Sequence, residues 1–405
     1  GYCGTAITTP GASERKRKGG VAVSVIANLS LLGFFKYFIF AQETLNQMIE
    51  VFGGEPTVLL QIVLPVGISF YSFQSMSYSI DLYRGHAERA RSFTDFCCYV
   101  SMFPQLVAGP IVRYREIAEQ LYDRPQRGEL FHLGVLNFAV GFSKKVLIAN
   151  TLGEVADLCF GAGAMSPHVA WFGVIAYSFQ IYFDFSGYSD MAIGLGHMLG
   201  FRLPINFRAP YRADSITDFW RRWHVSLSSW LRDYLYIPLG GNRKGVRITY
   251  RNLLLTMLLG GLWHGAQWTF IVWGAIHGLS LAVERLVGKR PFYANLGRPV
   301  RVLITYVLVL FSWVFFRSHG LEASVEYLGA MFGGLGESAA GAVLAGRVYQ
   351  PFYVVMMLIA AGLVWGGLET HELVERARRS TPLALGVLVL FLLAVVAMFS
   401  QAENP

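Results

Sequence analysis

Long apolar stretches alternate along the chain with polar segments that glycine and proline interrupt. Several of these stretches approach or exceed the roughly 20 residues that a helix needs to cross a bilayer. The shorter ones are expected to tilt or to be completed by neighbouring residues. The candidate spans are Val21–Phe40, Phe131–Asn150, Val169–Phe183, Asn252–Leu281, Val300–Phe316, Phe352–Gly367 and Leu383–Phe399. This pattern predicts an all-α polytopic membrane protein.

Other segments are too polar or too interrupted to be simple spans. They are Val58–Ile80, Phe96–Val112, Ile181–Gly200 and Asp218–Leu239. Polar, irregular backbone persists at membrane depth only when it is packed in protein or lines a water-filled cavity. We therefore predict a bundle of transmembrane helices and short re-entrant or tilted helices around a central cavity. No internal repeat is visible, so residues 1–405 are expected to form a single membrane-embedded domain.

The stretch Asn252–Leu281 carries basic residues near both of its ends. A single crossing would place one of these basic patches on the outer side, against the usual distribution of positive charge. A tilted pair of short helices would avoid that conflict. The sequence alone leaves both arrangements open.

Composition supports a membrane location. Hydrophobic residues make up 54% of the chain and charged residues 15%, whereas soluble domains carry about a quarter charged residues. The net charge of +8 is concentrated in basic patches beside the apolar stretches, which indicates loops on the cytoplasmic side of the membrane. Nucleic acid binding is disfavoured because whole spans separate these patches. The four cysteines have neither metal-ligand nor disulfide-framework spacing.

His264 is the most informative single residue. It follows an almost uncharged run that starts at Asn252. A helix would carry the imidazole roughly 20 Å along its axis, close to the middle of a hydrocarbon core about 30 Å thick. Ionisable groups at that depth usually face a polar cavity in which they function. The structural alternative is a neutral imidazole that is hydrogen-bonded inside a helix bundle. Neighbouring glycines would let a backbone or an acyl chain approach the ring.

Two further histidines lie in the same motif-rich region. His224 sits one helical turn from Arg221, and together with His264 it favours a two-histidine site. His277 lies thirteen positions beyond His264, roughly 220° further round a helix, so the two rings are expected to face different ways. We therefore expect His264 to be reactive and His277 to be structural.

Asp184 and Asp190 are six positions apart, roughly 240° around a helix, so they converge only if Gly187 breaks that helix. Each aspartate has two open interpretations: helix capping with ion pairing to arginine, or a direct role in the site. No metal site is expected, because the histidine spacings are not local ligand spacings and no HExxH pattern occurs. Nucleophile-elbow, phosphate-loop and dinucleotide motifs are also absent from the sequence.

Taken together, these segments resemble the membrane-bound O-acyltransferase family, and most closely its alginate O-acetylation branch. The resemblance covers roughly residues 20 to 400. The motifs that carry it are Leu64–Gln74, Phe103–Ile111, Tyr182–Asp190, Asp218–His224 and Leu262–Ala266. The buried histidine of the family is matched by His264, and the upstream Asn or His of the second signature falls on His224.

The resemblance implies an O-acyltransferase with a pore-like cavity that has His264 at its constriction. An acetyl group would come from a cytoplasmic thioester donor, acetyl-CoA or another acyl thioester, and no bound cofactor is expected. It would cross the membrane for O-acetylation of an exopolysaccharide such as alginate, through a periplasmic or extracellular acetyltransferase partner. Membrane lipid is the remaining partner. Members of this branch usually extend further at both ends, so a chain running from Gly1 to Pro405 is expected to be trimmed.

In the expected mechanism, neutral His264 acts as general base on an acceptor hydroxyl that attacks the thioester carbonyl. His224 would orient or polarise a reactant, and an acyl-histidine intermediate is an open variant. Asp190 or Asp184 would hold an imidazole tautomer or pair with arginine. The expected substrate-binding residues are Asp190, Trp263, Arg222 and Gln105.

Two other functions fit parts of the pattern. One is transfer of D-alanyl or another acyl group to a cell-wall polymer, with an acyl carrier protein as donor. The other is a polysaccharide or small-molecule transporter, which also combines broken helices with a polar interior. A transporter needs no reactive histidine and usually shows inverted repeats, so the sequence favours acyl transfer.

Overall fold

The computed structural model describes residues 2–124, 128–163, 165–288, 290–334 and 339–402. Within these ranges the chain is helical and has no β-strand, which confirms the expected all-α class. Among the same residues, four continuous helical segments are long and apolar enough to cross a membrane, and a bent pair, Gly341–Val348 with Pro351–Gly366, is a further candidate. The four segments are Glu14–Val51, Gly128–Phe160, Arg298–Arg317 and Thr381–Ser400.

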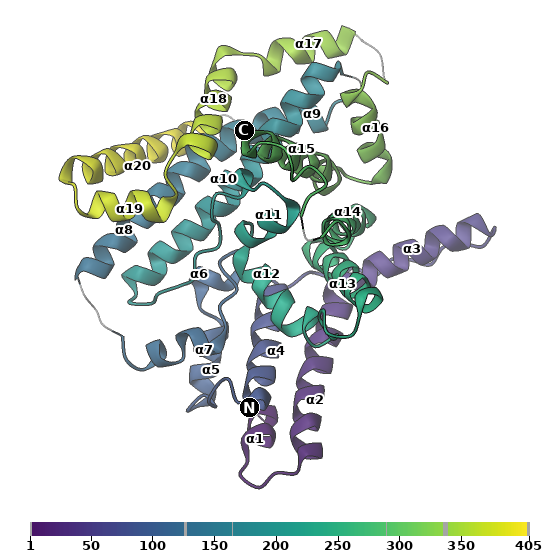
Figure 1. Cartoon of the computed structure of the whole chain (residues 1–405), viewed down its shortest axis with the longest axis vertical. Coiled ribbons are helices and arrows are strands. Elements are labelled where there is room, and N and C mark those ends of the chain that lie inside the picture. The colour runs from purple at the N-terminus through teal and green to yellow at the C-terminus, as the bar shows by residue number, and fades with distance from the viewer. Residues whose placement is uncertain (1, 125–127, 164, 289, 335–338, 403–405) are drawn as a thin grey trace.

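The N-terminal part contains two long antiparallel neighbours, α2 and α4, and a helix α3 that projects from the body (Figure 1). A π-helical turn, η1 (Gly33–Tyr37), joins α2 to α3, so the two form one candidate span. The bounds in this part are α1 (Tyr2–Thr8), α2 (Glu14–Leu32), α3 (Phe38–Val51), α4 (Ile68–Arg84), α5 (Phe93–Val100), α6 (Phe103–Leu106) and α7 (Tyr114–Ile117). A 3₁₀ turn, η2 (Glu119–Leu121), follows α7.

The central part is built on α10, which runs through the middle of the molecule and packs along α8 (Figure 1). The bounds in this part are α8 (Gly128–Ser143), α9 (Thr151–Phe160), α10 (Pro167–Met198), α11 (Ile216–Arg222), α12 (Val225–Leu231), α13 (Val246–His264), α14 (Trp268–Leu286) and α15 (Arg298–Arg317). The shorter turns are η3 (Lys144–Asn150), η4 (Pro210–Arg212) and η5 (Arg232–Tyr236). The largest hydrophobic core joins α9, α10, α11 and α15.

Two pairs of glycines let α8 and α10 approach closely. A Cβ atom on Gly141 would lie 2.5 Å from the carbonyl oxygen of Gly187, and one on Gly134 would lie 2.6 Å from that of Gly194. Small residues at such positions allow two helix backbones to meet. The expectation that Ile181–Gly200 is interrupted is wrong, because α10 is continuous from Pro167 to Met198 and passes through Gly187 unbroken.

The stretch Asn252–Leu281 folds as two helices, so the paired arrangement is correct and a single crossing is not. Helices α13 and α14 have 19 residues each and pack closely. A Cβ atom on Gly261 would lie 2.2 Å from the carbonyl oxygen of Phe270, and one on Gly274 would lie 2.4 Å from that of Met257. The glycines around His264 therefore serve this close helix contact.

The C-terminal part covers α8 and α9. Its bounds are α16 (Leu321–Met331), α17 (Ala339–Val348), α18 (Pro351–Gly366), α19 (Thr370–Arg378) and α20 (Thr381–Ala402). Helices α19 and α20 pack on α8, on the side of the molecule opposite α13 and α14 (Figure 1). Much of α20 is apolar and exposed, as expected for a helix that faces lipid.

Candidate active site

His264 is the last residue of α13, and its position is fixed by contacts to the end of that helix. The carbonyl oxygen of Leu262 accepts a hydrogen bond from the Tyr37 hydroxyl at 3.1 Å, and that of Trp263 accepts one from the Lys36 ammonium. Both donors come from η1 and satisfy carbonyls that a helix end leaves without partners. The imidazole is half-buried, and its ring centre lies 5.3 Å from those of Trp273 and Phe316.

The imidazole of His264 faces a cavity of about 270 Å³, called the His264 cavity below. Its walls come from α10, α13, α15, the end of α11 and the loop after α6. The lining residues are Ala108, Ile181, Asp184, Phe185, Tyr188, Trp223, His264, Trp313 and Phe316. Most of these side chains are aromatic or aliphatic. Asp184 supplies the one carboxylate among the residues that line this cavity, and it pairs with Lys145 of η3.

His224 lies close to His264 but is not among the residues that line the cavity. It is fully buried between α11 and α12, and its ring centre lies 6.3 Å from that of His264 and 4.7 Å from that of Phe185. Its backbone adopts a left-handed conformation with φ of 44°, which is uncommon for a residue with a side chain. Such strained residues concentrate at functional sites.

The tautomer of His224 follows from its hydrogen bonds. The Nδ1 atom lies 3.2 Å from Oδ1 of Asn206, and that oxygen also accepts from the backbone N–H and the hydroxyl of Ser226. The Ser226 N–H can only donate, so the Asn206 amide must present its oxygen to this group. His224 Nδ1 is therefore protonated, and Nε2 holds a lone pair. No residue that the structure describes gives Nε2 a hydrogen bond, although the atom is buried.

His277 has a different environment. Its Nδ1 accepts a hydrogen bond from the indole of Trp220 at 3.2 Å, and its Nε2 lies 3.0 Å from the hydroxyl of Ser312. The Ser312 hydroxyl in turn donates to the carbonyl oxygen of Val309. Both ring nitrogens thus have partners inside the bundle, which favours a structural role for this histidine.

The expected substrate-binding residues do not line the His264 cavity. The ring centre of Trp263 lies 5.1 Å from that of His264, but this ring packs in an aromatic cluster in which Phe70 lies 5.4 Å away. Arg222 pairs with Asp218 of its own helix at 2.8 Å. The fully buried Gln105 donates to the carbonyl oxygen of Tyr99 at 2.8 Å. None of the three side chains lines the His264 cavity.

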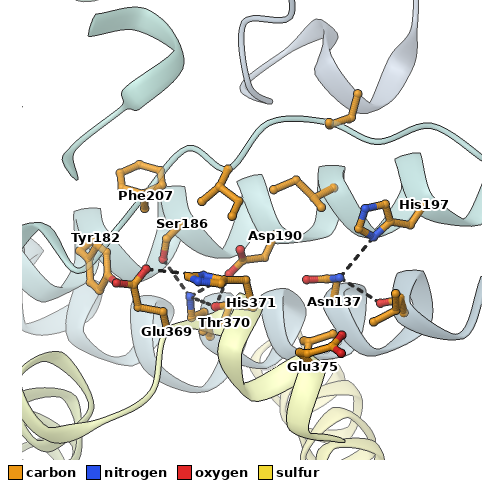
Figure 2. A pocket seen from close by; sticks show the side chains of 16 residues that line it. Asn137, Tyr182, Ser186, Asp190, His197, Phe207, Glu369, Thr370, His371 and Glu375 are labelled. Atoms are coloured by element: carbon orange, nitrogen blue, oxygen red, sulfur yellow. Dashed lines mark hydrogen bonds and ion pairs between the residues drawn. The ribbon is translucent and has the colours of Figure 1, made fainter. Parts of the chain in front are cut away.

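Asp190 lines another cavity, of about 290 Å³, on a different face of α10 (Figure 2). There it accepts hydrogen bonds at 2.8 Å from the Lys144 ammonium and from the Thr370 hydroxyl. The pairing expected with arginine is made with a lysine instead. Because α10 is unbroken, Asp184 and Asp190 point into different cavities, and Asp184 is the one that meets His264. Among the described residues no group of three or more potential ligands has metal-binding geometry.

Comparison with known proteins decides the family. The model of the MBOAT, membrane-bound O-acyltransferase, family matches residues 84–317, more than half of the chain. The chain belongs to the membrane-bound O-acyltransferase family. The matched segment contains His264, His224 and Asp184. Family membership confirms the enzyme class expected from the sequence, an O-acyltransferase.

Several curated O-acyltransferases of this family share high similarity with the chain. It is 49% identical over 333 residues to the probable alginate O-acetylase AlgI of Pseudomonas putida, a match that covers 82% of this chain and 68% of the relative. The AlgI of Pseudomonas aeruginosa is 49% identical over 331 residues, which is 82% of this chain and 64% of the relative. A peptidoglycan O-acetyltransferase of Helicobacter pylori is 42% identical over 77% of this chain and 64% of its own length. The matches thus span about two thirds of these relatives.

Asp184 lines the His264 cavity, whereas sequence reasoning selected Asp190 as the substrate-binding aspartate. Asp184 and Asp190 point in different directions around a continuous helix, so the two could not share one site unless the helix broke. The helical phase does not reveal which aspartate faces His264. That depends on how α10 packs against α13 and α15, which the linear pattern does not encode.

Proposed function

We propose that this O-acyltransferase moves an acetyl group from a cytoplasmic thioester donor across the inner membrane for O-acetylation of an exopolysaccharide such as alginate. The names of the relatives with 49% identity support acetyl as the acyl group and a polysaccharide as the acceptor. The single observation that supports the site assignment is that His264 lines a cavity and the buried ring of His224 lies next to it, with ring centres 6.3 Å apart.

His264 acts as the general base. An acceptor hydroxyl attacks the carbonyl carbon of the thioester, and His264 takes the hydroxyl proton as the new C–O bond forms. The carbon–sulfur bond then breaks, and the departing thiolate recovers the proton from the imidazolium. The aromatic walls of the His264 cavity exclude water that would otherwise hydrolyse the thioester.

His224 orients the acceptor. Its Nε2 carries a lone pair in the tautomer that Asn206 enforces, so it accepts a hydrogen bond and does not donate one. It can therefore hold a hydroxyl for attack, but it cannot polarise a carbonyl oxygen in that state. Asp184 contributes a second acceptor among the residues that line the cavity.

The donor is acetyl-CoA or another acyl thioester from the cytoplasm. The acceptor hydroxyl belongs to a periplasmic or extracellular acetyltransferase partner, which passes the acetyl group to the polysaccharide. The basic patches beside the apolar helices support a cytoplasmic face for the donor.

The test measures acetyl esters on the polysaccharide of cells that carry only one variant. His264→Ala is expected to abolish acetylation while the amount of protein in the membrane stays normal, because the half-buried ring makes no hydrogen bond that the structure describes. His132→Ala, an exposed histidine on α8, is the matched control and should retain full acetylation. Full acetylation by His264→Ala would refute the mechanism.

The acyl group is tested separately. A teichoic acid D-alanyltransferase of Streptococcus thermophilus is 27% identical over 62% of this chain and 68% of its own length, so D-alanyl transfer is the second candidate. Cells that lack the protein should lose acetyl esters and keep D-alanyl esters. Loss of D-alanyl esters alone would replace acetyl by D-alanyl in the proposal and leave the role of His264 intact.

A further inference from the structure

One face of α10 forms a wall of the His264 cavity. Four residues of this helix line the cavity, spaced three, one and three positions apart: Ile181, Asp184, Phe185 and Tyr188. On a continuous helix such positions lie on the same side. This face therefore brings two polar side chains to the cavity, the carboxylate of Asp184 and the hydroxyl of Tyr188.

Acyl transfer at the His264 cavity needs a hydrogen-bond donor as well as a base. His264 accepts a proton, Nε2 of His224 holds a lone pair, and the carboxylate of Asp184 can only accept. When a hydroxyl attacks the thioester, the π electrons of the carbonyl bond move onto the carbonyl oxygen. Donors aimed at this oxyanion supply a large part of the rate enhancement in acyl transfer.

Besides His264, three side chains that line the cavity carry an O–H or N–H group. Trp313 is committed, because its indole donates to the Tyr211 hydroxyl at 3.1 Å. Trp223 is only 2% exposed, and its ring centre lies 5.0 Å from that of Trp313. Tyr188 is partly exposed, so its hydroxyl is the most accessible of the three groups.

The proton of the Tyr188 hydroxyl is not committed elsewhere. The backbone N–H of Ala108, in the loop after α6, donates toward the Tyr188 oxygen. A donor at that oxygen leaves the hydroxyl proton unused. No residue that the structure describes accepts this proton in a hydrogen bond. Ala108 also lines the cavity, so the contact holds the phenol oxygen at the cavity wall.

We propose that Tyr188 is a catalytic residue whose hydroxyl stabilises the oxyanion of the transfer at His264, an inference that rests on the proposed function. The acceptor oxygen bonds to the carbonyl carbon, His264 takes the acceptor proton, and the carbonyl oxygen becomes the oxyanion. Tyr188 donates a hydrogen bond to this oxyanion and keeps its own proton. The carbonyl bond then re-forms, the carbon–sulfur bond breaks, and the thiolate takes the proton from His264.

Tyr188→Phe tests this role, because it removes only the hydroxyl. Membranes of cells that make the polysaccharide and carry the full chain are supplied with acetyl-CoA, and acetyl esters are measured per amount of protein. Tyr188→Phe should lower kcat roughly 100-fold with little change in KM for acetyl-CoA, because the oxyanion exists only after attack. Tyr250→Phe is the matched control, a partly buried tyrosine of α13 that does not line the cavity, and should keep wild-type values. An unchanged kcat for Tyr188→Phe would overturn the proposal.

A fluorinated tyrosine at position 188 separates catalysis from packing. It keeps the ring and the hydroxyl, but its phenol ionises at a lower pH, and a phenolate cannot donate. The fall of kcat at alkaline pH should therefore begin at a lower pH than in the wild type. The other titratable groups at the cavity are His264, Asp184 and its partner Lys145, and they are identical in both proteins. An unchanged alkaline limb would contradict donation by Tyr188.

The outcome for Tyr188 can be separated from that for the proposed function. If His264→Ala loses transfer and Tyr188→Phe keeps it, the role of Tyr188 is wrong and the proposed function stands. If both variants keep transfer, the proposed function fails as well. Transfer of D-alanyl in place of acetyl would leave the test intact, because the same oxyanion forms on either thioester.

Discussion

Three donors converge on one oxygen next to the candidate active site. Oδ1 of Asn206 accepts from His224 Nδ1 and from both the N–H and the hydroxyl of Ser226. This arrangement holds the His224 ring in one tautomer and one orientation, as carboxylates and amides do for functional histidines elsewhere. Asn206 is therefore a positioning residue that acts through His224.

Replacement of Asn206 tests this role. Asn206→Leu leaves three buried donors without an acceptor, and the proton of His224 is then no longer held on Nδ1. Acetyl transfer should therefore fall by roughly ten-fold or more. Asn206→Asp keeps an acceptor oxygen and should retain clearly more activity. The measurement is the rate of ester formation per amount of folded protein in proteoliposomes. Equal losses in the two variants would show that the acceptor oxygen is unimportant.

Substitutions of the two aspartates of α10 are expected to affect different properties, activity at Asp184 and stability at Asp190. The side chain of Asp184 is 45% exposed at the His264 cavity, so Asp184→Ala should lower acetyl transfer with little effect on stability. The side chains of Asp190 and Lys144 are only 15% and 17% exposed. Asp190→Ala leaves an uncompensated lysine and should cost about 2 kcal/mol of unfolding free energy.

Thermal unfolding in detergent and ester formation per folded protein separate these two effects. Lys144→Met in combination with Asp190→Leu should recover much of the stability that Asp190→Ala loses, because neither position of the pair then carries a charge. If Asp184→Ala were the destabilising variant and Asp190→Ala the inactive one, the assignment of the two cavities would be reversed.

Sequence alone could identify the histidines but not their neighbours. His264 and His224 stand out because ionisable side chains in an apolar region need a reason to be there. Trp263, Arg222 and Gln105 were expected at the substrate, and each lies within one of the motifs. Even a close neighbour need not share the cavity: the ring centre of Trp263 lies 5.1 Å from that of His264, yet Trp263 does not line the His264 cavity.

At the level of elements, glycines allow close helix contacts. The pairs Gly141–Gly187 and Gly134–Gly194 bring the backbones of α8 and α10 together, and this contact places Lys144 and Lys145 within reach of the aspartates on α10. The polar residues of α10 thus find partners on η3, which is why a polar helix can stay unbroken inside the bundle.

Enlargement of one of these glycines should destabilise the bundle. A side chain at Gly187 would meet the carbonyl oxygen of Gly141 at 2.7 Å, so Gly187→Leu should cost about 1–3 kcal/mol of unfolding free energy. Gly362 of α18 has no atom within 4 Å of its would-be Cβ, and Gly362→Leu is the matched control. Unfolding midpoints in the same detergent give the comparison. Equal midpoints for the two variants would contradict the proposed packing.

Membrane-spanning helices could be predicted from the sequence where a segment is almost entirely apolar. They could not be predicted where polar side chains of a helix are paired with residues of another element. Val21–Phe40, Val300–Phe316 and Leu383–Phe399 lie within helices long and apolar enough to cross a membrane. Ile181–Gly200 was expected to be too polar or too interrupted for a simple span because it carries Asp184, Ser186, Ser189 and Asp190. The partners of the two aspartates lie about forty residues earlier, on η3, and no local pattern reveals such a pairing.

At the scale of the whole molecule, α10 separates two cavities. The adjacent residues Lys144 and Lys145 pair with different aspartates of α10, and each aspartate lines a different cavity. His264 lines one cavity and Asp190 lines the other. The sequence predicted one central cavity, because a list of polar residues does not show how a helix partitions them.

The proposed transfer requires that reactants reach the His264 cavity from water. Ala108 lines this cavity and offers a position for a reporter thiol. The background should replace the natural cysteines at 3, 97 and 98 by serine, because Cys97 and Cys98 are exposed and Cys3 is partly so. Cys159 is fully buried in the core and can remain.

In that background, a small water-soluble thiol reagent should modify Ala108→Cys and abolish acetyl transfer, because the added group occupies a cavity of only about 270 Å³. Prior incubation with the thioester donor should slow the reaction, since the donor fills the same space. Leu136→Cys, at a fully buried position on α8, should stay unmodified under the same conditions and keep its activity. If Ala108→Cys were as inert as Leu136→Cys, the cavity would be closed to both aqueous sides, and an imidazole sealed from its reactants could not catalyse the transfer.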